Sequence, residues 1–202
     1  MSMDTLFPID RVCIFAKVTQ SLLSNCKPFT CGEADLDDFF YNDTIAYERD
    51  LMGKTYCWVE KEDISQVVGY VTLANAGIQT THMQNNPKRH LNKGIAYNKQ
   101  GRTYPAVLIG RIGVAKEFQG SQFRVGSQIM DFIKKWFVTD DNKTGCRYVL
   151  VDAMNTEHTL KYYKRNGFKP LFPRIEDEKE FYNIKSGDLR TRMYYFDLLL
   201  LK

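Results

Sequence analysis

Hydrophobic residues recur at helical and strand spacings in the first part of the chain. Residues 55–60 and 66–75 are β-branched and aromatic, and a charged turn separates them, which is typical of an antiparallel strand pair. Before this pair, apolar residues that share one helical face predict a helix closed by Gly53: Leu36, Phe39, Phe40, Tyr47 and Leu51.

The second half of the chain alternates buried strands with helices. Residues 106–115 and 147–154 are apolar runs of the kind that form buried strands, and 193–201 is expected to be a final strand. Thr156 is expected to cap a short helix that ends at Asn166-Gly167. Between the two buried strands, a helix starting near Val125 carries an apolar stripe: Ile129, Phe132, Ile133, Trp136 and Phe137.

This order of elements predicts an α/β fold with a single mixed, twisted β-sheet flanked by helices. Residues 106–154 form a βαβ unit, whose crossover is expected to be right-handed. The length of 202 residues favours a single domain over 1–202. A polar stretch at about 76–105 interrupts the pattern, and we interpret it as a loop excursion of the kind that usually has a function.

Composition excludes several classes of protein. Hydrophobic residues make up 44% and charged residues 26%, which is typical of a globular protein, and no apolar run is long enough to span a membrane. The five cysteines form no CxxC motif and the N-terminus resembles no signal peptide, so we expect reduced thiols and a cytoplasmic location without membrane contact. The three histidines are not at metal-ligand spacing, so no metal is expected.

The charge is unevenly distributed along the chain. The net charge is +4, yet residues 64–116 contain no Asp or Glu. This stretch is interpreted either as a contact surface for RNA phosphates or as a solvated basic loop that attracts an anionic ligand. Its basic residues are Lys88, Arg89, Lys93, Lys99, Arg102, Arg111 and Lys116. The acidic segment from Asp35 to Glu48 is interpreted as a solvated helix face, with recognition of a polyamine or of a basic segment of a partner protein as the alternative.

A polar turn at 117–127 joins the strand at 106–115 to the following helix. It contains Gly120 and Gly126 and leads into the start of a helix, where amides bind phosphates, and Arg124 would add a charged contact. The alternative is an ordinary loop. Neither a P-loop lysine motif nor GxGxxG is present, which disfavours nucleoside triphosphates and dinucleotides.

A second polar cluster runs from Asn155 to Phe168. Its tyrosines, Tyr162 and Tyr163, lie on the predicted short helix, where a phenol would be a reasonable proton donor to a leaving thiolate. The alternative is that the two rings form an aromatic pair in the core.

Two segments together resemble the GNAT superfamily of acetyl-CoA-dependent N-acetyltransferases. LIGRIGV with FQGSQFRVGSQIM is similar to its motif A, although the turn is two residues longer than usual, and VDAMN with YYKRNGFKP is similar to motif B. The resemblance implies splayed central parallel strands, acetyl-CoA as co-substrate and no metal. It also implies a set of residues that bind acetyl-CoA: Ile112, Gly113, Val114, Gln119, Gly120, Ser121, Gln122, Arg124, Val125, Gly126, Ser127 and Asn155.

A narrower resemblance points to the GNAT toxins of toxin–antitoxin pairs. FTCGEADLDDFF, RTYPAVLIGRIGV and RTRMYYFDL are similar to segments of that group. It implies transfer of acetyl to the α-amine of aminoacyl-tRNA, an antitoxin protein as partner, and a homodimer as a candidate state. The alternatives are an N-acetyltransferase for a small-molecule or protein amine, and a CoA- or RNA-binding module without catalysis.

The resemblance also implies a mechanism. The amine would attack the thioester directly, without an acyl-enzyme, while an N–H of the strand at 112–114 polarises its carbonyl. Tyr163 is the expected catalytic acid, because it lies four residues before Gly167 as in the family's Y-x-x-x-G-F, with Tyr162 as its rival. The general base stays open between Glu157, Asp152 and water.

Overall fold

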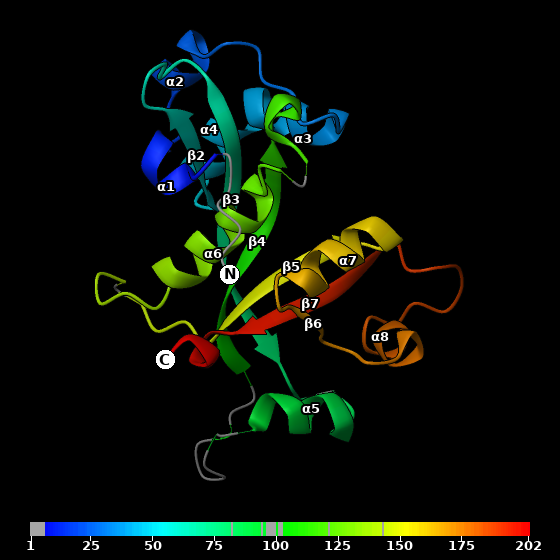
Figure 1. The fold of residues 1–202 in the computed structure, drawn as a ribbon. Helices are drawn as coiled ribbons and strands as arrows, with labels where there is room; N and C mark the ends of the chain where they lie inside the picture. The colour runs from blue at the N-terminus through cyan, green and yellow to red at the C-terminus, as the bar shows by residue number, and fades with distance from the viewer. Residues whose placement is uncertain are drawn as a thin grey trace. The chain divides into compact units, whose positions relative to one another are not determined.

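The strands of the protein belong to one sheet, and the chain divides into two compact units. The computed structural model describes residues 7–81, 83–93, 95, 100, 103–120, 122–142 and 144–202. Among these, seven strands form a sheet in the order β1-β2-β3-β4-β5-β7-β6 (Figure 1). One unit comprises residues 1–74 and 109–133, and the other 75–108 and 134–202. The sheet with its flanking helices confirms the predicted α/β fold with a mixed sheet.

In the first unit, antiparallel pairing forms the edge of the sheet. Strand β2 (Lys54–Glu60) pairs with β3 (Val67–Gln79), as predicted, with an irregularity at Trp58/Val59. Strand β1 (Cys13–Lys17), which the sequence did not predict, pairs with the other side of β2.

The helices of the first unit include the one predicted from the apolar face at 36–51. It consists of α3 (Ala34–Asp38), a π-helical turn (Phe39–Asp43) and α4 (Thr44–Arg49), and follows the short helices α1 (Ile9–Val12) and α2 (Gln20–Asn25). The prediction that Gly53 closes it is wrong, because Leu51 takes the left-handed conformation at φ 59° and leaves its side chain 90% exposed. Gly53 instead permits a close approach, since a Cβ there would lie 2.8 Å from the Leu73 carbonyl oxygen.

Aromatic rings fill the core of the first unit. Phe40 lies between Phe29 and Tyr70, with ring centroids 4.9 and 5.0 Å away. Helix α6 (Val125–Trp136), which was predicted, packs through Phe132, whose ring lies 4.6 Å from Phe15. Along the chain, α6 follows β4 (Thr103–Val114).

The expected loop at about 76–105 contains regular structure. Strand β3 continues to Gln79, α5 spans Asn85–Asn92, and β4 begins at Thr103. Two tyrosines of the second unit hold α5. The hydroxyl of Tyr148 donates to the Leu91 carbonyl and that of Tyr104 to the Asn92 side chain, both at 2.7 Å. The segment expected to be a loop therefore contains a helix, α5, which is bound to the rest of the second unit.

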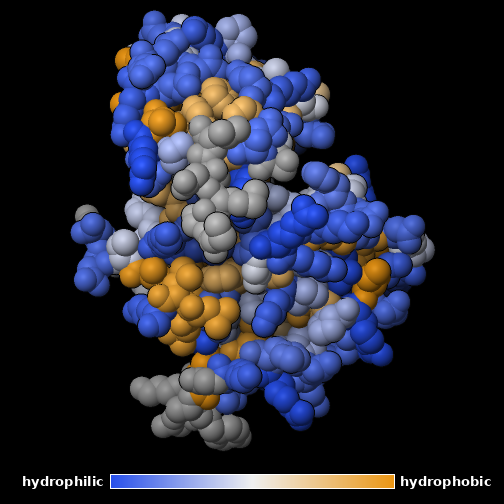
Figure 2. Space-filling view, in the orientation of Figure 1, coloured by the Kyte–Doolittle hydropathy of each residue, from blue (hydrophilic) through white to orange (hydrophobic). Residues whose placement is uncertain are grey.

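Strands β5 (Tyr148–Met154) and β7 (Thr191–Asp197) form the antiparallel centre of the second unit, and β6 (Lys169–Pro170) pairs with β7. The prediction of a strand over 193–201 is wrong at its end. The Asp197 carboxylate accepts from the Leu199 amide at 3.0 Å and turns the chain into a 3-10 helix (Leu198–Leu201). Leu199, Leu200 and Leu201 of this helix are exposed, and Figure 2 shows hydrophobic surface in the region where Figure 1 marks the C-terminus.

Two helices flank these strands in the second unit. The predicted α7 (Glu157–Arg165) is capped by Thr156, whose hydroxyl accepts from the Thr159 amide, and Gly167 ends it at φ +81°. Helix α8 (Ile175–Phe181) was not predicted. It is held by Glu178, which forms a buried ion pair with Arg192 and accepts from the Met193 amide at 2.7 Å. None of the helices among the described residues is long and apolar enough to cross a membrane.

Candidate active site

The first part of the candidate site is the loop between β4 and α6, which we call the 119–124 loop; its Ser121 lies outside the described residues. Gly120 has φ +115° and Arg124 has φ +50°. The Arg124 amide donates to the Gly120 carbonyl at 3.1 Å, and the Gln128 amide donates to the Arg124 carbonyl at 3.0 Å. The chain thus makes a tight turn immediately before α6, and the sequence places a glycine where the backbone requires one.

Two glutamine side chains fix this loop. Gln119, predicted as a cofactor contact, donates through its amide to the carbonyls of Cys31 at 2.8 Å and Val114 at 2.7 Å, and so ties the loop to the end of β4. Gln128, which sequence reasoning missed, accepts from the Ile9 amide at 3.0 Å and donates to the Phe123 carbonyl at 2.9 Å. The only sequence signal for Gln128 is a polar residue within the first turns of an amphipathic helix.

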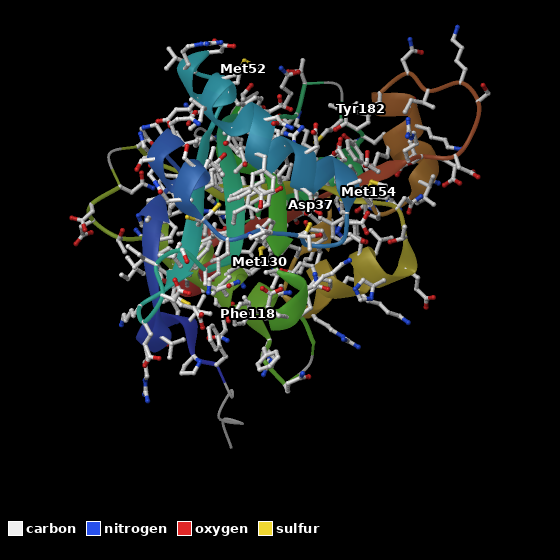
Figure 3. The ribbon with its side chains drawn as sticks, turned by 90° about the horizontal axis from the view of Figure 1, so that it is seen from above. Asp37, Met52, Phe118, Met130, Met154 and Tyr182 are labelled. Atoms are coloured by element: carbon white, nitrogen blue, oxygen red, sulfur yellow. The ribbon has the colours of Figure 1, made fainter. Side chains whose placement is uncertain are left out.

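Neighbouring side chains brace the same region. The ring of Phe118, just before the loop, lies 4.9 Å from Phe7 (Figure 3). Asp37, expected on a solvated face, instead accepts from the Thr30 hydroxyl at 2.6 Å and the Cys31 amide at 2.8 Å. Burial alone would raise the pKa of Asp37, but these hydrogen bonds outweigh it and lower the pKa, so this carboxylate stays ionised and holds the segment that Gln119 contacts.

The composition and geometry of the loop suit an anion. Gln122 and Arg124 are exposed, and no Asp or Glu occurs between Phe118 and Met130. The helix dipole is positive at the start of α6, where backbone amides point outward along the helix axis. A phosphate group is therefore the kind of ligand that the start of α6 fits.

Strand β4 contains two glycines near the loop, Gly110 and Gly113, and packing requires a glycine only at Gly113. A Cβ there would lie 2.7 Å from Cε1 of Tyr70, whereas a Cβ at Gly110 would lie 3.8 Å from the nearest atom, the Thr72 carbonyl oxygen. The predicted cofactor strand at 112–114 therefore has a packing reason for its glycine. Ile112 and Val114 on either side of it are half-buried.

This difference makes a testable prediction for stability. Because the ring of Tyr70 is buried and cannot easily move, Gly113→Ala is expected to lower the free energy of unfolding by about 1–3 kcal/mol. Gly110→Ala, in the same strand, is expected to change it by less than about 0.5 kcal/mol. Urea denaturation of both variants checks this, and equal effects would contradict the close contact at Gly113.

The second part of the candidate site is Tyr163 on α7. Its side chain is 7% exposed, and its ring packs against Phe168 and Tyr162 at centroid distances of 5.6 and 5.1 Å. Burial, aided by the negative charge of Asp152, raises the pKa of Tyr163 to about 12. The phenol is therefore protonated at neutral pH, as a proton donor must be. Tyr162 is only half-buried.

The end of α7 and the residue before its cap hold Tyr163 in place. The Phe168 amide donates to the Tyr163 carbonyl at 3.0 Å, and buried Lys134 donates to the Asn166 carbonyl at 3.1 Å. Asn155, predicted to contact the cofactor, donates through its side chain to the Leu189 carbonyl at 2.9 Å. That bond ties the start of α7 to the segment before β7.

The cysteines offer no activated nucleophile. All five are free, and burial raises the pKa of each, to about 12 for Cys13 and Cys57 and to about 11 for Cys31. Because a thiol and not a thiolate is present at neutral pH, an acyl-cysteine intermediate is disfavoured. Among the described residues, no three His, Cys, Asp or Glu side chains gather as metal ligands would.

A mixed sheet whose strand β4 leads through a tight loop into α6 suits a transferase that binds a phosphate-bearing donor, and comparison with known families shows the particular family. The acetyltransferase (GNAT) domain matches residues 53–170, so the chain belongs to the GNAT family. The protein is therefore an N-acetyltransferase of this family, whose acetyl donor is acetyl-CoA.

Solved structures of the toxin AtaT and of KacT share the fold along nearly the whole chain. The toxin AtaT, complexed with acetyl-methionyl-tRNAfMet, is 19% identical, with a TM-score of 0.63 over 94% of this chain and 96% of that one. A mutant of KacT with phenylalanine in place of a tyrosine is 17% identical, with a TM-score of 0.63 over 95% of this chain and 100% of that one. AtaTR bound with acetyl-CoA is 19% identical, with a TM-score of 0.59 over 94% and 98%.

Proposed function

We propose that the protein transfers the acetyl group of acetyl-CoA to the α-amine of an aminoacyl-tRNA and acts as the toxin of a toxin–antitoxin pair. The observation that carries this proposal is the shared fold with AtaT over nearly the full length of both chains, because the AtaT structure contains an acetylated aminoacyl-tRNA. The fold supports acetyl transfer as the reaction, and the distribution of basic residues in this chain supports an RNA-bearing acceptor.

The basic residues of the acid-free stretch differ in their surroundings, and Lys88, on α5, is half-buried. Arg89 and Lys93 are exposed on and after α5, and they are suited to contact RNA phosphates. Arg111 lies 3.8 Å above the ring centroid of Phe39 and serves packing instead. Lys99 and Arg102 lie outside the described residues. The proposed RNA contact is therefore centred on α5.

Acetyl-CoA supplies an activated thioester. In our proposal the amides at the start of α6, with Arg124, bind its pyrophosphate, and the backbone of 112–114 binds the pantetheine arm and polarises the thioester carbonyl. A neutral α-amine, available because its pKa is near 8, attacks that carbonyl, and the C–S bond breaks. Tyr163 gives its proton to the departing sulfur, and the proton released by the amine returns to solvent.

The raised pKa of Tyr163 does not weaken this role. The same burial that disfavours a phenolate also disfavours a thiolate in those surroundings, so the sulfur takes up a proton there more readily than in water. The phenol in turn recovers its proton from solvent after the transfer.

The proposal includes a protein partner and a location. AtaT has been solved with the C-terminus of the antitoxin AtaR, and KacTA with DNA, so we infer that an antitoxin protein binds this chain too. Charged tRNA, the proposed acceptor, places the reaction in the cytoplasm. The homodimer stays a prediction.

The 119–124 loop gives a direct test of acetyl-CoA binding. Gly120→Ala is expected to raise the Kd for acetyl-CoA about tenfold, because a side chain at φ +115° costs about 1–2 kcal/mol that the loop relieves only by moving. Gly187→Ala is the matched control, since Gly187 also has positive φ, at +82°, with open space around it in another loop. Isothermal calorimetry measures both, and an unchanged Kd for Gly120→Ala would contradict the assignment.

An acceptor screen tests the function itself. With labelled acetyl-CoA, we expect aminoacyl-tRNA to be acetylated with kcat/KM that falls steeply as salt is raised, because RNA phosphates contribute to binding. Deacylated tRNA, polyamines and peptides serve as competing acceptors. A salt-independent preference for a polyamine or a peptide would contradict the proposal.

A further inference from the structure

Residues 7–9, which we call the 7–9 arm, lie against the 119–124 loop within the first unit. The ring of Phe7 lies 4.9 Å from that of Phe118, just before the loop, and 6.4 Å from that of Phe123, within it. All three rings are half-buried. A segment from the start of the chain therefore packs on both sides of the turn that leads into α6.

One side chain on α6, that of Gln128, joins the arm to the loop. Its nitrogen donates to the carbonyls of Phe7 and Phe123, both at 2.9 Å. Its oxygen accepts from the Ile9 amide at 3.0 Å. These bonds use both donor hydrogens and the acceptor of the side-chain amide, each facing a partner of the opposite kind, so the group has one defined orientation.

The bond to Phe123 fixes the peptide unit that precedes Arg124. The Phe123 carbonyl and the Arg124 amide belong to the same planar unit. The carbonyl accepts from Gln128, and the amide donates to the Gly120 carbonyl at 3.1 Å. Arg124 has φ +50°, a left-handed conformation that is unfavourable for a residue with a side chain. Both ends of this peptide unit are thus tied, which holds the turn in a shape that Arg124 alone would not favour.

The arm is itself anchored to the rest of the first unit. The Ile9 side chain is buried, and α1 follows directly, with the Arg11 and Val12 amides donating to the Pro8 carbonyl at 3.0 and 3.1 Å. The Lys61 amide donates to the Val12 carbonyl at 2.9 Å and ties the end of α1 to the turn after β2. The arm therefore has a defined position from which it can hold the loop.

We infer that the 7–9 arm is part of the acetyl-CoA site, with Gln128 as its positioning residue. Docked through Gln128 and Phe7, the arm keeps the 119–124 loop in the shape that binds the pyrophosphate. The inference rests on the proposed binding of acetyl-CoA at this loop and is independent of the acceptor. A loop already held in its binding shape loses less conformational freedom when the ligand arrives. Because coupling is reciprocal, acetyl-CoA must stabilise the docked arm by the same factor.

The first test measures acetyl-CoA affinity by calorimetry. Gln128→Ala is expected to raise the Kd about tenfold, and Phe7→Ala to raise it in the same direction, because each releases the arm from the loop. Phe7→Tyr keeps the ring and is expected to restore the wild-type Kd. Phe15→Ala is the matched control: this half-buried ring on β1 lies 4.6 Å from Phe132 on α6, away from the loop, so its loss should reduce stability and leave the Kd unchanged.

The second test measures the coupling from the side of the arm. Saturating acetyl-CoA is expected to slow hydrogen exchange of the Ile9 amide, followed by NMR, by about the factor that Gln128→Ala costs in Kd. In Gln128→Ala protein this amide has lost its acceptor, and acetyl-CoA should no longer slow its exchange. The Leu22 amide, which donates to the Thr19 hydroxyl at 3.2 Å at the start of α2, is a bond of the same kind and should not respond to acetyl-CoA.

The outcomes separate this inference from the proposed function. If Gln128→Ala and Phe7→Ala bind acetyl-CoA like the wild type, or if Phe15→Ala weakens binding as much as they do, the arm is not part of the site. An Ile9 amide that exchanges equally fast with and without acetyl-CoA would likewise overturn the coupling. Neither result affects the acetylation of aminoacyl-tRNA. Conversely, if the coupling is measured and no aminoacyl-tRNA is acetylated, the proposed function fails and the role of the arm stands.

Discussion

Tyr163→Phe is expected to lower kcat at least about 100-fold, because general acid catalysis contributes roughly 10²–10⁴ and the hydroxyl is the only group removed. The phenylalanine ring keeps the contact with Phe168, whose centroid lies 5.6 Å away, so the fold of α7 is preserved. The Kd for acetyl-CoA is expected to stay at its wild-type value. Single-turnover kinetics give the rate, and calorimetry gives the affinity.

Tyr162→Phe is the matched control for this experiment. Tyr162 is the neighbouring tyrosine on the same helix, and we expect its variant to retain most of the wild-type rate. A larger loss in Tyr162→Phe than in Tyr163→Phe would exchange the roles of the two residues. Wild-type turnover in both variants would remove the phenol from the mechanism altogether.

Glu178→Ala is expected to lower the free energy of unfolding by about 3–5 kcal/mol, the usual cost of leaving one partner of a buried ion pair alone. Arg192 and Glu178 have side chains 8% and 2% exposed, so water cannot replace the lost contact. The Met193 amide also loses its acceptor. Urea denaturation measures the change.

An exposed ion pair of the same unit provides the control. Lys161 and Glu157 lie one turn apart on α7 with side chains 61% and 82% exposed, and Lys161→Ala is expected to cost at most about 0.5 kcal/mol. The double variant Glu178→Leu/Arg192→Met should recover part of the loss, since no charge is then buried alone. A loss below about 1 kcal/mol for Glu178→Ala would mean that the pair is hydrated.

The sequence predicted those elements whose buried residues are apolar and regularly spaced. Helix α6 was predictable from its stripe, and α7 from Thr156 and Gly167 at its ends. Helix α8 was not, because its buried residues include Asp177 and Glu178, which give no hydrophobic pattern. Helix α5 buries only Pro87 and Leu91, and β6 is two residues long, so neither carries a periodic signal.

The residues of the candidate site also differ in whether a local sequence pattern could identify them. Gly120 and Arg124 were named from a local turn, and Tyr163 from its distance to Gly167, and their roles stay predictions. The bracing contacts are long-range: Gln119 binds Cys31 across 88 residues of chain, and Gln128 binds Ile9 across 119. The Asp152–Met193 pair likewise depends on strand register. No local sequence pattern predicts such long-range contacts.

The most direct test of the account is mass spectrometry of aminoacyl-tRNA after incubation with the protein and acetyl-CoA carrying a deuterated acetyl group. The account predicts that the amino acid released from methionyl-tRNA bears a deuterated acetyl group on its α-nitrogen, and that Tyr163→Phe protein forms it far more slowly. Methionine released without any label, while another amine in the same mixture becomes acetylated, would contradict it.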